Sequence, residues 1–424
     1  GLAAVAGLGI FLATATRGAS ADRAWQLFHV NWLFFTSLSG GSLALTATHK
    51  VAKAKWSGAI LRFAEAAGAF MPLSLLGLVL IFTVGYDHIY GPMQAQLHTL
   101  SAGKALWLSR PWMFTRLFVT LGLLTWLGGR MVWTDMLGDF AHTAPHLSGE
   151  RKAKFERWGA GFDEAANEVR LSELAPRFAV LYAITFTLVA FDGVMALQPH
   201  WYSNLLGGFF FMGAFLAAHA LLALTMMYGV RHLDLVDLVS PKQRHDLGKM
   251  VFGFTVFWAY LMWAQFLVIW YGNMPEETGF VFARLWGHWM PIGRAVLLGM
   301  FVIPFIGLLG VAPKKFPFTL GLFTSVTLVA FWLERYLLVL PSLTTSGGPQ
   351  FGLVELGPTL AFLGLFLVAY ALFARAFPMV SPRLALRTLE QERAHGHGGA
   401  SAHDEDAKDF TLPNEMERRD RPRA

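Results

Sequence analysis

About ten apolar stretches run through the sequence, each close to the ~20 residues that an α-helix needs to cross a bilayer. Short polar loops separate them, and they cover residues 1–14, 25–48, 57–84, 111–132, 178–197, 201–228, 247–271, 289–311, 318–340 and 351–374. Hydrophobic residues make up 55% of the 424 and charged residues 15%, with a mean hydropathy of +0.46, which is outside the range of soluble globular chains. We therefore predict an all-α, polytopic membrane protein with about ten transmembrane helices.

The chain divides at the loops between these stretches. The first stretch is short, and residues 1–24 could form a signal peptide, but they lack a basic segment. A first membrane helix and outer loop, whose beginning precedes this sequence, is the preferred interpretation. The predicted parts are residues 1–24, a four-helix bundle at 25–198 with a helical cytoplasmic linker at 134–177, a second bundle at 199–341, a last membrane helix at 342–377 and a charged tail at 378–424.

Short matches suggest that the two bundles are repeats. TLVAF occurs at residues 187–191 and again at 327–331, in each case shortly before a proline, and SLALT at residue 42 resembles LLALT at residue 221. Arg116 in the fourth stretch matches Arg294 in the eighth. Because an even number of spans restores the starting orientation, we expect two parallel four-helix bundles plus peripheral helices.

Basic residues predict the orientation. Each loop that follows an even-numbered stretch contains basic residues, among them Lys50, Lys53, Lys55, Arg151, Lys152, Lys154, Arg157, Arg231, Lys242, Arg244, Lys314, Lys315, Arg383 and Arg387. Positively charged loops stay in the cytoplasm, so both termini are expected there. The same rule explains the formal net charge of +6 without a nucleic-acid partner.

The chain contains no cysteine, which excludes disulfides, thiolate-bound iron–sulfur clusters and covalently attached haem. His29 and His219 fall at opposite ends of their helices, so they do not form a haem-binding pair. Histidines of the tail, at 395, 397 and 403, lack a fixed scaffold for a metal. We predict that the chain itself binds no redox cofactor and no metal.

Ionisable residues inside the predicted spans are the main functional signal, because each costs about 2.5–3.5 kcal/mol near a span centre unless it meets a partner or water. Asp192 lies about two turns below the outer end of its helix, and Arg116 lies about as far below the same surface on the preceding helix. We expect these two residues to pair. Glu334, with Arg335, is expected to repeat the arrangement near Arg294.

Further polar residues extend this set. Arg62 and Glu65 are three residues apart and share a helix face near the cytoplasm, with His219 towards the same surface. The other polar positions inside the spans are His29, Asn31, Thr255, Tyr260 and Gln265. A proton path would use Asp192, Glu65, Glu334, His219, Arg116, Arg294 and Tyr260. The alternative is that these residues form interhelical pairs that fix packing.

Four motifs resemble a known family. They are FDGVMALQPHWYSN at 191–204, HDLGKMVFGFTVFWAY at 245–260, WYGNMPEET at 270–278 and ERYLLVLP at 334–341. Together they resemble the second large membrane subunit of alternative complex III, a bacterial quinol:electron-acceptor (cytochrome c type) oxidoreductase. That subunit is of the polysulfide-reductase (NrfD-like) membrane type.

The resemblance implies ten helices, as two four-helix bundles plus two peripheral helices, in the bacterial cytoplasmic membrane. It also implies partners: a sister NrfD-like membrane subunit nearer the quinol site (menaquinol or ubiquinol), an iron–sulfur subunit and c-type haem subunits. Position by position, the family motifs match Asp192, His200, Trp201, Tyr202, His245, Asp246, Glu276 and Glu277. FWLER at 331–335, where an aspartate is expected near Glu334, and Gln198 in place of an acid depart from the family pattern.

Two other functions stay open from the residues. A free-standing secondary transporter would have broken helices at matching places in both halves, whereas Pro72 and Pro304 lie in stretches that do not correspond. Alternatively the chain has its own quinol site near the outer surface, with His88, His200 and Tyr202. The sequence leaves the quinone type, the electron acceptor and any proton stoichiometry undetermined.

Overall fold

The described part of the chain is all-helical. The computed structural model describes residues 1–16, 18–54, 57, 60–232, 239, 241–344 and 347–381, and no strand occurs among them. Eight helical segments there are long and apolar enough to cross a membrane: Leu61–Thr83, Arg110–His146, Glu164–Leu197, Leu206–Gly229, Pro241–Gly272, Gly287–Gly307, Pro317–Leu343 and Leu353–Ala376. The chain is thus a helical, multi-pass membrane protein.

Each of the ten predicted stretches is largely helical. The helices are α1 (Leu2–Ala15), α2 (Gly18–Val51), α3 (Leu61–Ala67), α4 (Met71–Thr83), α5 (Tyr86–Gln94), α6 (Ala102–Trp107), α7 (Arg110–Thr143), α8 (Gly149–Gly159), α9 (Glu164–Gly193), α10 (Leu206–His232), α11 (Pro241–Gly272), α12 (Pro275–Leu285), α13 (Met290–Leu297), α14 (Ile303–Gly307), α15 (Val311–Lys315), α16 (Pro317–Leu343) and α17 (Leu353–Ala376). α1 is short, and α2 is not among the eight apolar segments. The number ten stays a prediction.

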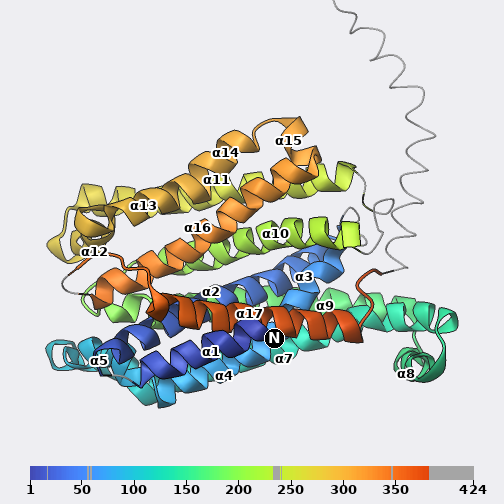
Figure 1. Cartoon of the computed structure of the whole chain (residues 1–424), viewed down its shortest axis with the longest axis horizontal. Coiled ribbons are helices and arrows are strands. Elements are labelled where there is room, and N and C mark those ends of the chain that lie inside the picture. The colour runs from blue at the N-terminus through green and yellow to red at the C-terminus, as the bar shows by residue number, and fades with distance from the viewer. Residues whose placement is uncertain are drawn as a thin grey trace, which may run out of the picture.

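The long helices lie roughly along one axis (Figure 1). α5 and α12 lie at one end of the molecule, which we call the α5 end. α8 lies at the opposite end, which we call the α8 end. α7, with 34 residues, is about 50 Å long at 1.5 Å per residue, longer than the ~30 Å hydrocarbon core of a bilayer. It therefore continues into part of the predicted linker, which is otherwise formed by α8 and the start of α9.

α2 is the central helix and contacts α4, α9, α10, α16 and α17. Two groups of helices surround it. In the first group, α2, α4, α7 and α9 contact one another in the pairs α2·α9, α7·α9, α4·α7 and α2·α4. In the second group, α10 contacts α11 and α16, and α16 contacts α13. Between the groups, α2 contacts α10 and α16, and α9 contacts α10.

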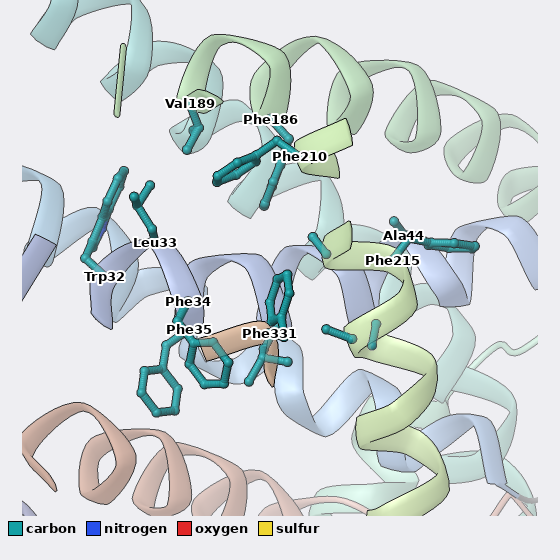
Figure 2. Close-up of a cluster of buried hydrophobic side chains, with 14 of the residues drawn as sticks. Trp32, Leu33, Phe34, Phe35, Ala44, Phe186, Val189, Phe210, Phe215 and Phe331 are labelled. Atoms are coloured by element: carbon teal, nitrogen blue, oxygen red, sulfur yellow. The ribbon is translucent and has the colours of Figure 1, made fainter. Parts of the chain in front are cut away.

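Aromatic and aliphatic side chains fill the region where the groups meet (Figure 2). The labelled residues come from α2, α9, α10 and α16: Trp32, Leu33, Phe34, Phe35, Ala44, Phe186, Val189, Phe210, Phe215 and Phe331. All of them are buried. In a bilayer, helices associate through close packing of this kind, because lipid tails are as apolar as the side chains.

α1 and α17 pack side by side over α2, and small residues make the approach possible. A Cβ added at Gly7 would lie 2.2 Å from the backbone nitrogen of Ala361, and one at Gly364 would lie 2.3 Å from that of Ala4. Neither backbone can move aside without separating the helices. The two glycines therefore set the distance between α1 and α17.

We expect Gly7→Leu to separate α1 from α17 and to lower the thermal midpoint of the protein in detergent. Gly9→Leu on the same helix is the matched control, because a Cβ at Gly9 meets nothing within 4 Å. Thermal unfolding of the two variants measures the difference. Equal midpoints would show that the close approach of the helices contributes nothing to stability.

Candidate functional site

The predicted pair of Asp192 and Arg116 is present at the α5 end. Nε of Arg116 donates a hydrogen bond of 2.6 Å to Oδ2 of Asp192, and Nη2 of Arg116 contacts Oδ1, so the pair is bidentate. The Asp192 side chain is fully buried, whereas that of Arg116 is 12% exposed. Arg116 also donates to the carbonyl of Trp107 at 2.6 Å and lies over the Trp107 ring. The arginine thus has three partners and the carboxylate depends mainly on one.

Aromatic side chains hold the backbone at this pair. The hydroxyl of Tyr90 donates to the carbonyl of Asp192 at 3.1 Å, and Nε2 of His29 lies 2.8 Å from the carbonyl of Gly193. These two carbonyls are near the C-terminus of α9, where helical carbonyls have no intrahelical partner. Burial raises the pKa of Tyr90 well above its usual value, and the negative charge of Asp192 adds to this effect.

We expect stability to fall at alkaline pH because of Tyr90. A phenol whose pKa is raised on folding stabilises the fold fully below the unfolded pKa of about 10, and this contribution is lost as pH rises above it. Tyr90→Phe should therefore lose less stability than the wild-type protein between about pH 8 and pH 11. Thermal midpoints at the two pH values measure the difference. Identical losses in both proteins would contradict this assignment.

A second cluster of charges lies at the α8 end, where α2, α3 and α7 meet. Arg62 contacts Glu65 and Asp139, and its Nη2 lies 3.3 Å from Oδ2 of Asp135, which also contacts Lys50. Arg62 and the three carboxylates are buried. Among the described residues, these ion pairs join three carboxylates to two cations.

Sequence reasoning found only half of this cluster. The sequence predicts that Arg62 and Glu65 share a helix face, but it places Asp135 and Asp139 in the cytoplasmic linker and Lys50 in a loop that indicates orientation. Their spacing was the available signal, because residues four apart share a helix face. Oγ of Ser381 adds a hydrogen bond of 2.5 Å to Oδ1 of Asp139.

Buried polar side chains follow α2 from one end of the molecule to the other: His29, Asn31, Thr36, Ser37, Ser39, Ser42, Thr46 and His49. From His29 to His49 the helix rises about 30 Å, which equals the thickness of the hydrocarbon core, ~30 Å. The hydroxyls of Thr36 and Ser42 make no hydrogen bond to any described group. These polar side chains also explain why α2 is less apolar than the other long helices.

The second predicted pair is not formed as expected. Glu334 accepts a hydrogen bond of 3.0 Å from Nε1 of Trp258 and lies 3.1 Å from Nη1 of its neighbour Arg335. Arg294 is exposed and forms no ion pair with the described residues, although it and Glu334 line the same cavity of about 720 Å³. The length of the Arg335 side chain lets it fold back along α16, which puts its guanidinium within reach of the adjacent acid.

The other predicted proton-path residues are separate from these clusters. His219 is buried, with Nδ1 2.9 Å from the carbonyl of Phe215 and its ring between Phe215 and Phe254. Tyr260 is 61% exposed on α11 and lines the same cavity as Glu334. No described hydrogen bond or ion pair joins either side chain to Asp192, Glu65 or Glu334.

The predicted outer quinol residues lie at the α5 end without forming one site. Nδ1 of His88 lies 2.6 Å from Oδ1 of Asp22, and the His88 ring stacks on Trp25. Nε2 of His200 lies 3.2 Å from Oγ1 of Thr99, while Tyr202 is half exposed. No described contact joins the two histidines.

Some predictions fall outside the described residues. These include Lys55, the side chain of Arg231, and the tail from residue 382 onward with its histidines. Within the described ranges, no group of three or more histidine or carboxylate side chains is arranged to hold a metal ion.

Fold and site together define a class: a multi-pass helical membrane protein with buried ion pairs at both ends of its central helix. Neither a protein-family model nor a curated protein matches the chain.

Proposed function

We propose that the chain is the second large membrane subunit of a bacterial quinol:electron-acceptor oxidoreductase of the alternative complex III type, and that its first helix group provides a proton route. The four motifs between residues 191 and 341 support the family assignment. The buried charges support the proton route.

The observation that carries the proton route is the position of the two charged clusters near the two ends of α2. Arg116 and Asp192 lie at the α5 end, and the cluster around Arg62 lies at the α8 end. Between them α2 offers histidines, an asparagine and hydroxyls, which can bind water or pass a proton. The carboxylates of the cluster around Arg62 lie at the end of this route that would face the cytoplasm, and they are the groups that we propose for proton uptake.

The contacts between helices support two repeated four-helix bundles. In the two proposed units α2 corresponds to α10, and α9 corresponds to α16. The contact α2·α9 then corresponds to α10·α16, and the contact α2·α16 corresponds to α10·α9. All four contacts occur. This is the pattern expected of two units related by a twofold axis along the membrane normal. α1 and α17 would be the peripheral helices.

In this proposal the α8 end and both termini face the cytoplasm, and the α5 end faces the outside of a bacterial cytoplasmic membrane. The basic residues of α8, Arg151, Lys152, Lys154 and Arg157, support this orientation. The sister NrfD-like subunit, the iron–sulfur subunit and the c-type haem subunits would be the partners. Electrons from quinol would pass through cofactors of those partners.

A secondary transporter is supported less well. Two spans do contain breaks: a 3₁₀ turn at Gly68–Phe70 precedes Pro72, and a π-helical segment at Leu298–Val302 precedes Pro304. Such breaks form substrate sites when they occur at matching places in both repeats. Here they fall in the second span of one unit and the third span of the other, so they do not match.

Purification from native membranes tests the proposed complex. We expect the chain to migrate in a blue native gel with subunits that contain c-type haem and iron–sulfur clusters, seen by haem staining and by electron paramagnetic resonance. Migration as a single subunit, with solute uptake into proteoliposomes, would instead establish the transporter.

Asp192→Asn tests the proton route separately. Asparagine keeps an oxygen that can accept a hydrogen bond from Arg116 but cannot release a proton at neutral pH. We expect the complex to assemble and proton transfer coupled to quinol oxidation to fall by at least about tenfold. Asp192→Glu, which keeps the carboxylate, is the control. Loss of assembly in Asp192→Asn would show that the pair is structural.

A further inference from the structure

A basic groove between α7 and α9 is not used by the proposed function. Its volume is about 830 Å³, and its charged lining residues are Arg130 on α7 and Arg170, Glu173 and Arg177 on α9. Three arginines against one glutamate give the lining a formal net charge of +2. Arg177 lies 3.2 Å from Glu173, whereas Arg130 and Arg170 form no ion pair within the part of the chain that the structure describes.

The groove lies where these helices leave the hydrocarbon core. Arg130 is nineteen residues after Pro111, which starts the apolar part of α7, and this corresponds to about 28 Å of helix against a core of ~30 Å. On α9, Arg177 directly precedes the apolar stretch that begins at Phe178. Arginines from two neighbouring helices thus reach the same membrane surface.

Two tryptophans beside the arginines mark the same level. Trp126 is 59% exposed and Trp133 is also exposed, and both line the groove. The Arg130 guanidinium lies 5.4 Å from the centre of the Trp126 ring. Exposed tryptophans of membrane proteins collect at the level of the lipid headgroups, so the guanidinium groups are held at the depth of the lipid phosphates.

We propose that this groove binds the headgroup of an anionic phospholipid, with Arg130 and Arg170 on the phosphate and the tryptophans beside the first carbons of the acyl chains. Guanidinium groups bind phosphate oxygens through paired, charge-assisted hydrogen bonds. A basic pocket between membrane helices on the cytoplasmic side is typical of such sites. The site does not depend on the proposed respiratory function.

Native mass spectrometry of the full chain, with any subunits that co-purify, tests the site. The protein is taken from mixed micelles of phosphatidylglycerol and phosphatidylcholine, and the retained lipids are counted. We expect the wild-type protein to retain phosphatidylglycerol in preference to phosphatidylcholine. Arg130→Gln/Arg170→Gln should weaken this retention about tenfold for each arginine removed.

Two further variants make the result specific. Arg157→Gln/Arg375→Gln removes the same charge from exposed positions outside the groove and should retain the lipid. Gly129→Leu keeps every arginine but fills the groove, and it should fold, because a Cβ at Gly129 meets nothing within 4 Å and leucine favours a helix over glycine. It should also lose the lipid, and it decides the question if the double arginine variant does not fold.

Several results would overturn the proposal. One is equal loss of phosphatidylglycerol from the variants Arg130→Gln/Arg170→Gln and Arg157→Gln/Arg375→Gln, which would indicate attraction by overall charge. Another is displacement of the lipid by millimolar inorganic phosphate, which would indicate a site for free phosphate. A third is that the Gly129→Leu variant retains the lipid and loses a protein subunit instead.

Discussion

Replacing Arg116 by Met is expected to lower the free energy of unfolding by about 3–5 kcal/mol, because it leaves the Asp192 carboxylate buried without its cation. Loss of the arginine should cost more stability than loss of the carboxylate, because the two side chains differ in their other partners. Arg116 keeps the carbonyl and the ring of Trp107 when Asp192 is changed, whereas the fully buried Asp192 side chain pairs with no second cation among the described residues. Denaturant unfolding in detergent micelles measures the change.

The double variant Arg116→Met/Asp192→Leu distinguishes two causes of the lower stability of Arg116→Met. One is a buried carboxylate without its cation, and the other is the lost packing of the arginine side chain. Replacing both members of a buried pair by apolar groups is often neutral, so most of the loss in Arg116→Met should be recovered. Arg375→Met is the control, because Arg375 is exposed in the last turn of α17 and such changes stay within about 0.5 kcal/mol. A double variant as unstable as Arg116→Met would mean that the arginine acts through packing.

Replacing Arg62 by Met should have the largest effect of any single substitution at the α8 end. Arg62 contacts Glu65, Asp135 and Asp139 at once, so its removal takes away a cation that all three carboxylates share. Repulsion adds to the cost of a buried charge, so we expect a loss of at least about 3–5 kcal/mol or failure to accumulate in the membrane.

Restoring the charge balance provides the test. Arg62→Met/Asp139→Asn removes one acid with the base, and it should recover part of the stability and yield. Measurement of membrane-inserted protein and of its thermal midpoint compares the two variants. If Arg62→Met alone is as stable as the wild-type protein, the cluster does not hold α3 against α7.

Much of the fold could be predicted from the sequence, because a length of about 20 apolar residues is dictated by the bilayer itself. The pair of Asp192 and Arg116 was predictable for a similar reason: two opposite charges at one depth on consecutive spans have few other partners. Asp135 and Asp139 could not be predicted as members of the cluster. The sequence of an acidic helix end is the same whether water solvates its carboxylates or a buried Arg62 pairs with them. The ion pairs of Arg62 on α3 with both aspartates of α7 decide between these cases.

Glu334 shows a second limit of sequence reasoning. Adjacent residues on a helix point in different directions, so Arg335 was not expected to be the main partner. The partner depends on the path of a long, flexible side chain and on Trp258 from another helix. Neither can be predicted from spacing.

The close approach of α1 to α17 also affects how the protein is made. Gly7 and Gly364 allow the two backbones to touch, yet α2 to α16 are translated between these helices. During synthesis, the glycine face of α1 must therefore be covered by lipid or by an insertion factor until α17 has been made. Docking of α17 on α1 would then follow the synthesis of α2 to α16, so the closest contact between two helix backbones would form between segments made far apart in time.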